Sequence, residues 1–231
     1  MPFPLPLKVK RLPLRRNKVI GFFLDLLFPV FCVGCKKEGS FLCASCKADV
    51  VVKRVPEHLP KKHRIKILYS ATHYHTPAVR DIIAQYKYEF ARDIAPDLTD
   101  LLEKHLRFAH FEKNADHIIV PVPLHARRAR WRGFNQAELV AQDIAQRLGI
   151  PFHSQALARI KNTTPQIKMN NRIKRLENIR GAFACADAQA IQGKTVILVD
   201  DVTTTGGTLA ECAGAVRQAG ARSVIAFVVA S

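Results

Sequence analysis

Apolar side chains recur along most of the chain in two alternating patterns. From Ile65 onward, short apolar runs rich in β-branched residues alternate with stretches whose apolar residues return every three or four positions. These patterns predict strands over residues 65–74, 118–122, 196–199 and 224–229, and helices over residues 78–88, 94–108, 136–148 and 209–219. Strands that alternate with helices predict an α/β fold, in which a mainly parallel sheet is flanked by helices on both faces.

The first 60 residues follow neither pattern for long. Residues 1–18 combine scattered basic charges with four prolines and no sustained apolar period, which predicts a flexible basic tail. Residues 19–60 hold a short apolar run and a group of cysteines, and the prolines and basic side chains of residues 51–63 predict a linker. We therefore expect three parts: the tail 1–18, a small module 19–60 and a main domain 61–231.

The apolar run from Val19 to Phe28 follows basic residues, as the apolar region of a signal peptide does. Asp25 and Pro29 interrupt it, no small-residue cleavage site follows, and it falls short of the about 18 residues that cross a bilayer. We expect a short helix packed on the next element and no stable membrane insertion. Weak association with a membrane surface is the alternative.

Composition and charge narrow the class of protein further. The 231 residues are 48% hydrophobic, which is enough to build a core. The 36 Lys and Arg residues exceed the 19 Asp and Glu residues, and the net charge of +17 favours polyanionic partners such as nucleic acid or polyphosphate. A solvated basic surface is the alternative. The six cysteines are too few and too clustered for a secreted disulfide scaffold, which indicates the cytoplasm.

Four of the cysteines are spaced as metal ligands. Cys32 and Cys35 form one C-x-x-C pair and Cys43 and Cys46 form a second, and seven residues that include a glycine separate the pairs. Four thiolates complete a tetrahedral zinc shell and leave no open position for catalysis, so the spacing predicts a structural, zinc ribbon-like site. A thioredoxin-like dithiol is the competing interpretation. The other cysteines, Cys185 and Cys212, lie in apolar-periodic segments and are expected in the core.

The strongest candidate for chemistry follows the predicted strand 196–199. Asp200 and Asp201 come first, and Thr and Gly residues then open a helix; we call residues 199–208 the Asp/Thr loop. Gly206 and Gly207 allow backbone amides to approach an anion, and the helix start adds its positive end. Two carboxylates beside a phosphate are favourable only if a neutral or cationic group lies beside the phosphate. Ribose hydroxyls, with a magnesium ion nearby, meet that need. An ordinary strand, turn and helix with a capping threonine is the alternative.

A second cluster follows the predicted strand 118–122. Arg127, Arg128 and Arg132 lie at the carboxyl end of that strand, where they would face the same crevice as the Asp/Thr loop. Guanidinium groups placed there would stabilise the negative charge of a departing pyrophosphate, although a solvated helix start is the alternative. His125 is a proton carrier or, as we favour, a polar residue at the strand end.

Residues 161–180 form a basic, irregular excursion between predicted elements. A mobile cover that excludes water from a reactive sugar would have this length and charge. A surface loop that contacts nucleic acid is the alternative, and the sequence leaves the two interpretations open.

The Asp/Thr loop, Val199-Asp200-Asp201-Val202-Thr203-Thr204-Thr205-Gly206-Gly207-Thr208, closely resembles the loop that binds phosphoribosyl pyrophosphate (PRPP) in type I phosphoribosyltransferases. This resemblance implies that Asp200 and Asp201 contact the ribose 2- and 3-hydroxyls. It also implies that Thr203 to Thr208 hold the 5-phosphate, with Mg²⁺ accompanying PRPP.

Further segments carry a wider resemblance, over roughly residues 20–231. They are the apolar helix expected at Phe22–Phe28, the cysteine cluster, Pro-Val-Pro-Leu-His-x-Arg-Arg, Arg-Gly-Phe-Asn-Gln, Thr-Thr-Pro-Gln and Asn-Ile-Arg-Gly-Ala-Phe. In this order they are similar to the ComF/GntX family, which implies a type I phosphoribosyltransferase-like domain and an N-terminal zinc module. The family is associated with natural competence, with single-stranded DNA and with transformation or replication-restart proteins.

Two functions of different classes therefore remain open. In one, the protein is a DNA-handling module of natural transformation that binds PRPP or a related ribose phosphate as a ligand. In the other, it is an active phosphoribosyltransferase, similar to amidophosphoribosyltransferases, in which Asp200, Asp201, Arg127, Arg128 and Arg132 act in transfer to a nitrogen nucleophile.

Overall fold

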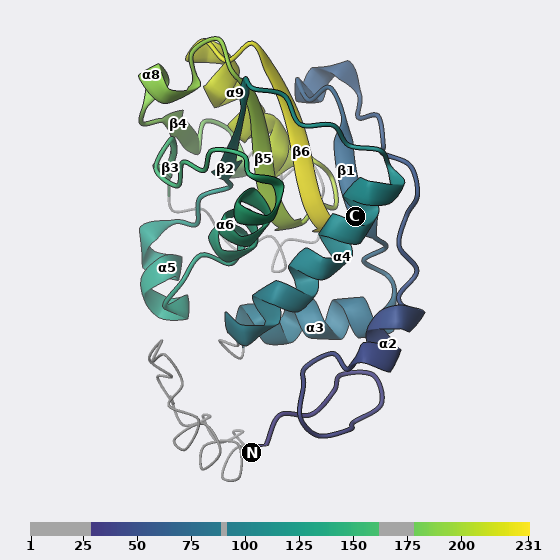
Figure 1. The fold of residues 1–231 in the computed structure, drawn as a ribbon. Helices are drawn as coiled ribbons and strands as arrows, with labels where there is room; N and C mark the ends of the chain where they lie inside the picture. Colours follow the sequence, from purple (N-terminus) through teal and green to yellow (C-terminus); the bar gives the residue numbers. More distant parts are fainter. Residues whose placement is uncertain (1–28, 89–91, 162–177) are drawn as a thin grey trace.

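The computed structural model describes residues 29–88, 92–161 and 178–231. The predicted tail 1–18 and the predicted helix 19–28 lie outside the described residues. Four parallel strands form the central sheet in the order β1-β6-β5-β2 (Figure 1). Their bounds are β1 Leu68–Thr72, β2 His117–Pro121, β5 Thr195–Val202 and β6 Ser223–Ala230. The predicted α/β fold with a parallel sheet is confirmed.

Helices cover both faces of this sheet, as the alternating pattern predicted. On one face, α4 and α6 pack against the strands; on the other lies α9 (Figure 1). Helix α3, which precedes α4, reaches the carboxyl end of β5 through its last turn. The bounds are α3 Pro77–Tyr88, the 3₁₀ turn η2 Arg92–Ile94, α4 Ala95–Phe108, α6 Gln136–Leu148 and α9 Gly207–Gln218. Among the described helices, none is both long and apolar enough to cross a membrane.

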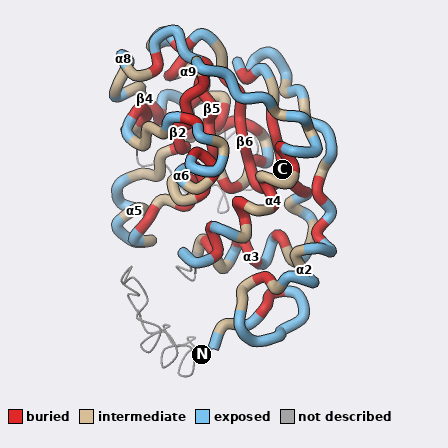
Figure 2. The backbone as a smooth tube through the Cα atoms, viewed as in Figure 1, coloured by how far each residue is buried: buried red, intermediate tan, exposed pale blue. Residues whose placement is uncertain are grey.

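The position of β5 between two layers of helices explains why its sequence is a continuous apolar run. Ile197 and Val199 belong to the core cluster on the α4 and α6 side, whereas Val196 and Leu198 belong to the cluster on the α9 side. Successive side chains of a strand point to opposite faces, and both faces of this strand are buried (Figure 2). The carboxyl end of β5 is therefore held between two packed layers.

A small antiparallel pair, β3 Leu157–Arg159 and β4 Phe183–Cys185, adjoins the α9 side of the domain. A short helix, α8 Ala188–Ile191, follows β4. The sequence pattern did not predict this pair, because three-residue strands are too short to show a period. The basic excursion leaves from β3 and returns to β4, and its residues 162–177 lie outside the described residues.

Residues 51–63, expected as a linker, lie along the open edge of β1. Isolated antiparallel bridges join Val52 to Thr72 and Glu57 to Leu68, and residues Lys61–His63 form the 3₁₀ turn η1. Val52 also packs in the same core cluster as Val33 of the cysteine module. The edge pairing satisfies backbone groups that a free linker would leave to water. The domain boundary near residue 60 remains a prediction.

Candidate functional site

The Asp/Thr loop lies at the carboxyl end of β5, between the neighbouring strands β6 and β2. Gly206 adopts φ 72°, a left-handed conformation that side chains disfavour, and α9 begins at the next residue. A Cβ atom on Gly206 would lie 3.2 Å from the ring of His63. The absence of a side chain therefore lets the loop turn sharply while His63 packs directly on it.

The threonines of the loop have different surroundings. Thr203 is buried and its backbone N–H donates to the carbonyl of Ala230 at 3.0 Å, which ties the loop to the end of β6. The Thr205 hydroxyl oxygen accepts a hydrogen bond of 3.4 Å from the backbone N–H of Gly207, whereas Thr204 is exposed. The loop is thus held at its base and open at its tip, as an anion-binding turn requires.

The paired acids meet a lysine that the sequence analysis did not single out. Lys87, in the last turn of α3, places its Nζ atom 3.0 Å from Oδ1 of Asp201, whose side chain is 8% exposed. Burial alone would lower the pKa of Lys87, but the charges of Asp201 and Asp200 outweigh it and raise this pKa. The sequence does show Lys87 in the last turn of a predicted amphipathic helix, next to Tyr86, which is buried. Spacing in the sequence cannot show, however, that this turn lies at the end of β5.

Asp200 is unfavourably charged in this ligand-free arrangement. Burial, followed by repulsion from Asp201, raises its pKa to about 7, although Lys87 and the backbone N–H of Asp201 act in the opposite direction. That N–H donates to Oδ1 of Asp200 at 2.9 Å. Two carboxylates therefore share one neighbouring ammonium group, and a further cation or hydroxyl donor would relieve the remaining repulsion.

Two arginines add positive charge near this pair. Burial lowers the pKa of Arg159 on β3, and the charge of Asp200 is among the influences that partly offset the effect. The guanidinium carbon of Arg159 lies 5.1 Å from the centroid of the Phe183 ring. The charge of Arg132 lowers the pKa of Lys87, which places Arg132 within electrostatic reach of the same group. Arg159 was missed because the strand that carries it was not predicted.

The predicted arginine cluster lies on the short helix α5, Ala126–Arg132 (Figure 1). His125 caps this helix, because its Nδ1 accepts a hydrogen bond of 3.2 Å from the backbone N–H of Arg127. Arg128 lies one residue further along and Arg132 at the end, where its Nη1 donates to Oε1 of Gln136 at 3.1 Å. The capping geometry supports the interpretation of His125 as a polar residue at the strand end, while the roles of Arg127 and Arg128 remain predictions.

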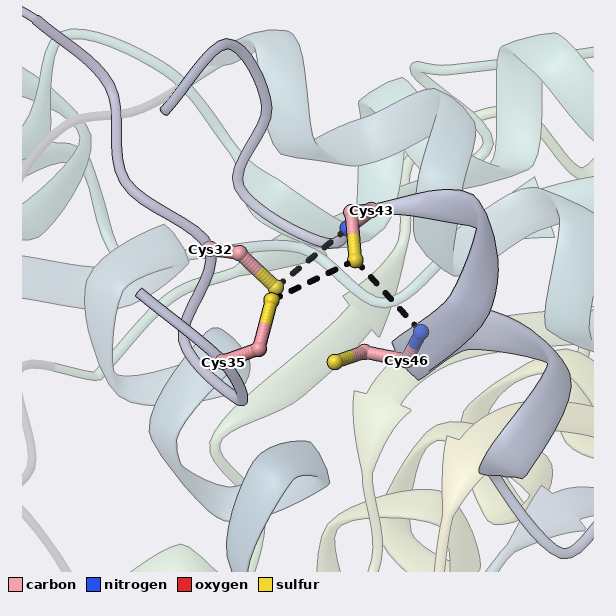
Figure 3. A group of neighbouring side chains, drawn as sticks. All are labelled: Cys32, Cys35, Cys43 and Cys46. Carbon is pink, nitrogen blue, oxygen red and sulfur yellow. Dashed lines mark hydrogen bonds between the residues drawn. The ribbon is translucent and has the colours of Figure 1, made fainter. Parts of the chain in front are cut away.

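The four predicted metal ligands come together in one cluster. Cys32 and Cys35 lie on one turn, and Cys43 caps α2, Ala44–Asp49, which carries Cys46 (Figure 3). Their sulfur atoms all lie within 4.8 Å of one another, and the Cys35 and Cys43 sulfurs are 3.6 Å apart. In a four-sulfur zinc site, Zn–S bonds of about 2.3 Å separate the sulfurs by about 3.8 Å. All six cysteines of the chain carry free thiols.

The electrostatics of this cluster also suit a cation. Burial disfavours a thiolate at Cys32, but backbone N–H donors from Cys43, Cys35 and Gly34 outweigh it and lower the pKa of Cys32 to about 6. Hydrogen bonds within the sulfur cluster raise the pKa of Cys46 to about 12. The thiolate is therefore favoured at Cys32 and disfavoured at Cys46 while no positive ion is present. The donor set is therefore compatible with zinc.

Of the two remaining cysteines, Cys212 lies in the core as predicted, whereas Cys185 is only partly buried. Cys212 on α9 is fully buried within the core cluster on that side of the sheet, and Cys185 on β4 packs against the same cluster. Burial raises the pKa of both thiols, which makes thiolate chemistry unfavourable there.

Comparison with known proteins agrees with this architecture. Residues 135–231 match the family model described as "Phosphoribosyl transferase domain". The chain is 32% identical over 197 residues to "DNA utilization protein YhgH" of Salmonella typhimurium, covering 84% of this chain and 85% of that protein. It is 30% identical over 200 residues to "Competence protein F" of Haemophilus influenzae, covering 84% and 86%.

One solved structure, the glutamine PRPP amidotransferase from B. subtilis complexed with ADP and GMP, is similar over 60% of this chain and 26% of its own. The identity is 19% and the TM-score 0.40, so this likeness adds nothing to the argument. The identity and coverage of these relatives are sufficient to show that the chain belongs to the ComF/GntX family and carries a phosphoribosyltransferase domain.

Proposed function

We propose that the Asp/Thr loop binds PRPP or a related ribose phosphate together with Mg²⁺. The observation that carries this proposal is the acid pair of half-buried Asp200 and buried Asp201, placed directly before a glycine-containing turn at the carboxyl end of β5 in which Thr204 is exposed. An anion site beside two carboxylates suits a ligand that presents both a phosphate and hydroxyl groups.

Each part of the loop has a chemical role in this proposal. Carboxylate oxygens of Asp200 and Asp201 accept hydrogen bonds from the ribose 2- and 3-hydroxyls, and the amides and hydroxyls from Thr203 to Thr208 hold the 5-phosphate. Mg²⁺ would neutralise the pyrophosphate oxygens. Before the ligand binds, the positive charge of Lys87 partly compensates the charges of the two carboxylates. This compensation allows two adjacent acids to be buried at the end of β5.

Titration calorimetry with PRPP tests this site. The wild-type protein is expected to release heat with PRPP in the presence of Mg²⁺, and the double variant Asp200→Asn/Asp201→Asn is expected to lose that heat. Asp81→Asn, an exposed acid on α3, is the matched control and should bind like the wild type. Absence of heat with the folded, zinc-loaded wild-type protein would reject the site.

The biological role that we propose is the handling of single-stranded DNA during DNA uptake and natural transformation. Two relatives carry the words "DNA utilization" and "Competence" in their names, and the chain has a net charge of +17. Helix α5 combines Arg127 and Arg130 with Trp131, which is 54% exposed; aromatic and basic side chains together bind single strands. Transformation or replication-restart proteins are the expected protein partners.

The salt dependence of single-strand affinity tests the part played by α5. Each phosphate contact contributes about 0.7 to the slope of log affinity against log salt for single strands. The variant Arg127→Gln/Arg128→Gln/Arg132→Gln is therefore expected to have a slope lower by about 2. An unchanged slope would remove these residues from the DNA path.

Catalytic phosphoribosyl transfer is the second candidate. The cations near the acid pair, Lys87, Arg132 and Arg159, favour it because they could stabilise a departing pyrophosphate. In this reaction the C1–O bond breaks with its electron pair on the pyrophosphate oxygen, a C1–N bond forms, and the nitrogen loses a proton to solvent. Pyrophosphate release should then require both PRPP and a nitrogen acceptor; PRPP binding without release with purines, pyrimidines, glutamine or ammonia would reject transfer to them.

We propose that zinc occupies the four-cysteine cluster and that its role is structural. Cys32, Cys35, Cys43 and Cys46 supply all four ligands, and Lys47 of the same module contacts Asp97 and Asp100 of α4 at 2.5 and 2.6 Å. Metal binding would therefore order a module that is anchored to the main domain. Elemental analysis should find zinc in equimolar amount, and a fully folded protein without bound metal would contradict this assignment.

A further inference from the structure

A second charged surface lies away from the Asp/Thr loop. A cavity of about 620 Å³ is lined by Lys61, Arg64, Lys66, Arg217 and Arg222, which we call the basic cleft. Its walls come from the η1 segment before β1, from the last turn of α9 and from the start of β6. The cleft is therefore at the amino-terminal ends of the parallel strands, whereas the Asp/Thr loop is at their carboxyl ends.

Part of the cleft lies far from the acid pair, although the η1 segment that forms one wall also reaches the Asp/Thr loop through His63. Helix α9 has 12 residues, begins beside the Asp/Thr loop and ends at the cleft. At a rise of 1.5 Å per residue, these two ends are about 18 Å apart. The wall of the cleft at the end of α9 is therefore distant from the acid pair that would hold the ribose phosphate.

The charge of the cleft is poorly compensated. Among the described residues that line it, none is acidic, and the five named side chains are all exposed. Lys61, Arg64 and Lys66 make no ion pair or side-chain hydrogen bond within the described residues. Asp116, outside the lining, pairs with Arg222. Several like charges held near one another repel, so an external anion would stabilise the arrangement.

Hydrogen bonds hold the side chains of the opposite wall. Nη1 of Arg217 donates to the carbonyl oxygen of Ala221 at 2.6 Å and also contacts that of Arg222, while Arg222 contacts Asp116 and Thr195. These bonds fix two guanidinium groups at the cleft before any ligand binds. Among the described residues, Lys61, Arg64 and Lys66 have no such partner that a ligand would have to displace. The hydrogen-bonded guanidinium groups of Arg217 and Arg222 thus lie in the same cleft as three Lys and Arg side chains that have no partner among the described residues. Such a lining suits an extended ligand with repeated negative charges.

We infer that the basic cleft binds the phosphate backbone of single-stranded nucleic acid, as a second contact surface at the end of the sheet opposite the Asp/Thr loop. This inference rests on the proposed DNA role. The cavity is larger than one phosphate group. Ile65 and Val224 at its base are buried, so the surface open to a ligand is mainly that of the Lys and Arg side chains. A nucleotide strand carries repeated phosphate groups, with which Arg and Lys form charge-assisted hydrogen bonds, and the proposed DNA role favours it over an acidic peptide.

The η1 segment connects the two surfaces. His63 lies between Lys61 and Arg64 and packs on Gly206 of the Asp/Thr loop, while its neighbours line the cleft. A strand held in the cleft would therefore contact the same short segment that supports the loop. The fold thus places a polyanion surface and a ribose phosphate site on two sides of one 3₁₀ turn.

Anisotropy of a labelled oligothymidine of about 16 nucleotides, measured with the full chain over a range of salt concentrations, tests this inference. The variant Arg64→Gln/Lys66→Gln removes two cleft charges and should lower the slope of log affinity against log salt by about 1.4. The matched control is Arg107→Gln/Lys113→Gln, which removes one exposed Arg and one exposed Lys outside the cleft. Its net charge is the same, and its slope should stay at the wild-type value. The charge-preserving variant Arg64→Lys/Lys66→Arg should also keep that slope.

The outcomes separate this inference from the proposed function. Wild-type protein that does not bind single strands at low salt would reject the DNA role and the cleft together. Binding by the wild type with the same slope in the cleft variant and in the control would reject the cleft alone. Displacement of the strand by polyglutamate as readily as by unlabelled oligothymidine would also overturn the assignment to nucleic acid.

Discussion

Asp200→Asn tests the electrostatics of the acid pair most directly. Asn has nearly the same size and keeps the Oδ1 atom that accepts the backbone N–H of Asp201. The substitution therefore removes the negative charge with little change in packing. Because that charge is unfavourable in the ligand-free fold, we expect Asp200→Asn to stabilise the protein at high pH while abolishing ribose phosphate binding.

The size and sign of the effect follow from the pKa. The pKa of Asp200 rises from 3.8 to about 7 on folding, a change of about three units or about 4 kcal/mol as an upper bound. Between these values the folded protein binds more protons than the unfolded chain, so the wild-type free energy of unfolding falls as pH rises. The penalty is absent below about pH 4 and complete above about pH 7. Asp200→Asn lacks it throughout.

Urea unfolding in magnesium-free buffer, at several pH values from about 4 to 8, measures this difference. The stability advantage of Asp200→Asn should grow from near zero to as much as about 4 kcal/mol over that range. The exposed control Asp81→Asn should change stability by less than about 0.5 kcal/mol. A difference that does not depend on pH, or a variant less stable than the wild type at about pH 8, would refute the reasoning.

Three further substitutions test the site and the cysteine cluster. Lys87→Met should destabilise the protein by about 3 kcal/mol in urea unfolding at neutral pH, because Asp201 would lose its only ammonium partner among the described residues. A destabilisation below about 1 kcal/mol would contradict this prediction. Gly206→Ala should destabilise by about 1 kcal/mol or more and weaken PRPP binding in calorimetry, since its φ of 72° and the His63 ring at 3.2 Å both oppose a Cβ; unchanged affinity would show that the turn tolerates a side chain. Gly34→Ala places a Cβ 2.8 Å from the Cys46 sulfur, so it should lower zinc affinity at least about tenfold in chelator competition. The control Gly214→Ala, whose Cβ would have ordinary contacts, should keep the wild-type zinc affinity. Equal zinc retention by the two variants would remove Gly34 from the ligand geometry.

The basic cleft and the acid pair also show how charge can be distributed within one fold. Near Asp200 and Asp201, buried charges of both signs lie close together, and their interactions change pKa values. At the cleft, exposed charges of one sign gather with little compensation. The first arrangement suits one small ligand of defined shape, and the second suits an extended polyanion whose affinity depends on salt.

The sequence by itself determined the elements that have a strong local period and the motifs that are contiguous. Helix α6 spans the predicted residues 136–148, because its apolar positions repeat over more than three turns and Gly149 ends it. The parallel sheet, the turn after β5 and the approach of four cysteines could be predicted for the same reason. The residues that determine these features are close to one another in the sequence.

The tertiary structure alone decided which distant residues meet. Lys87 and Asp201 are far apart in sequence, and only the packing of α3 at the end of β5 brings their charges within 3.0 Å. Arg159 depends on a three-residue strand whose partner β4 follows a long excursion, and the basic cleft joins the η1 segment to α9. Local periodicity carries no information on such contacts, because they depend on how separate elements pack rather than on any one element.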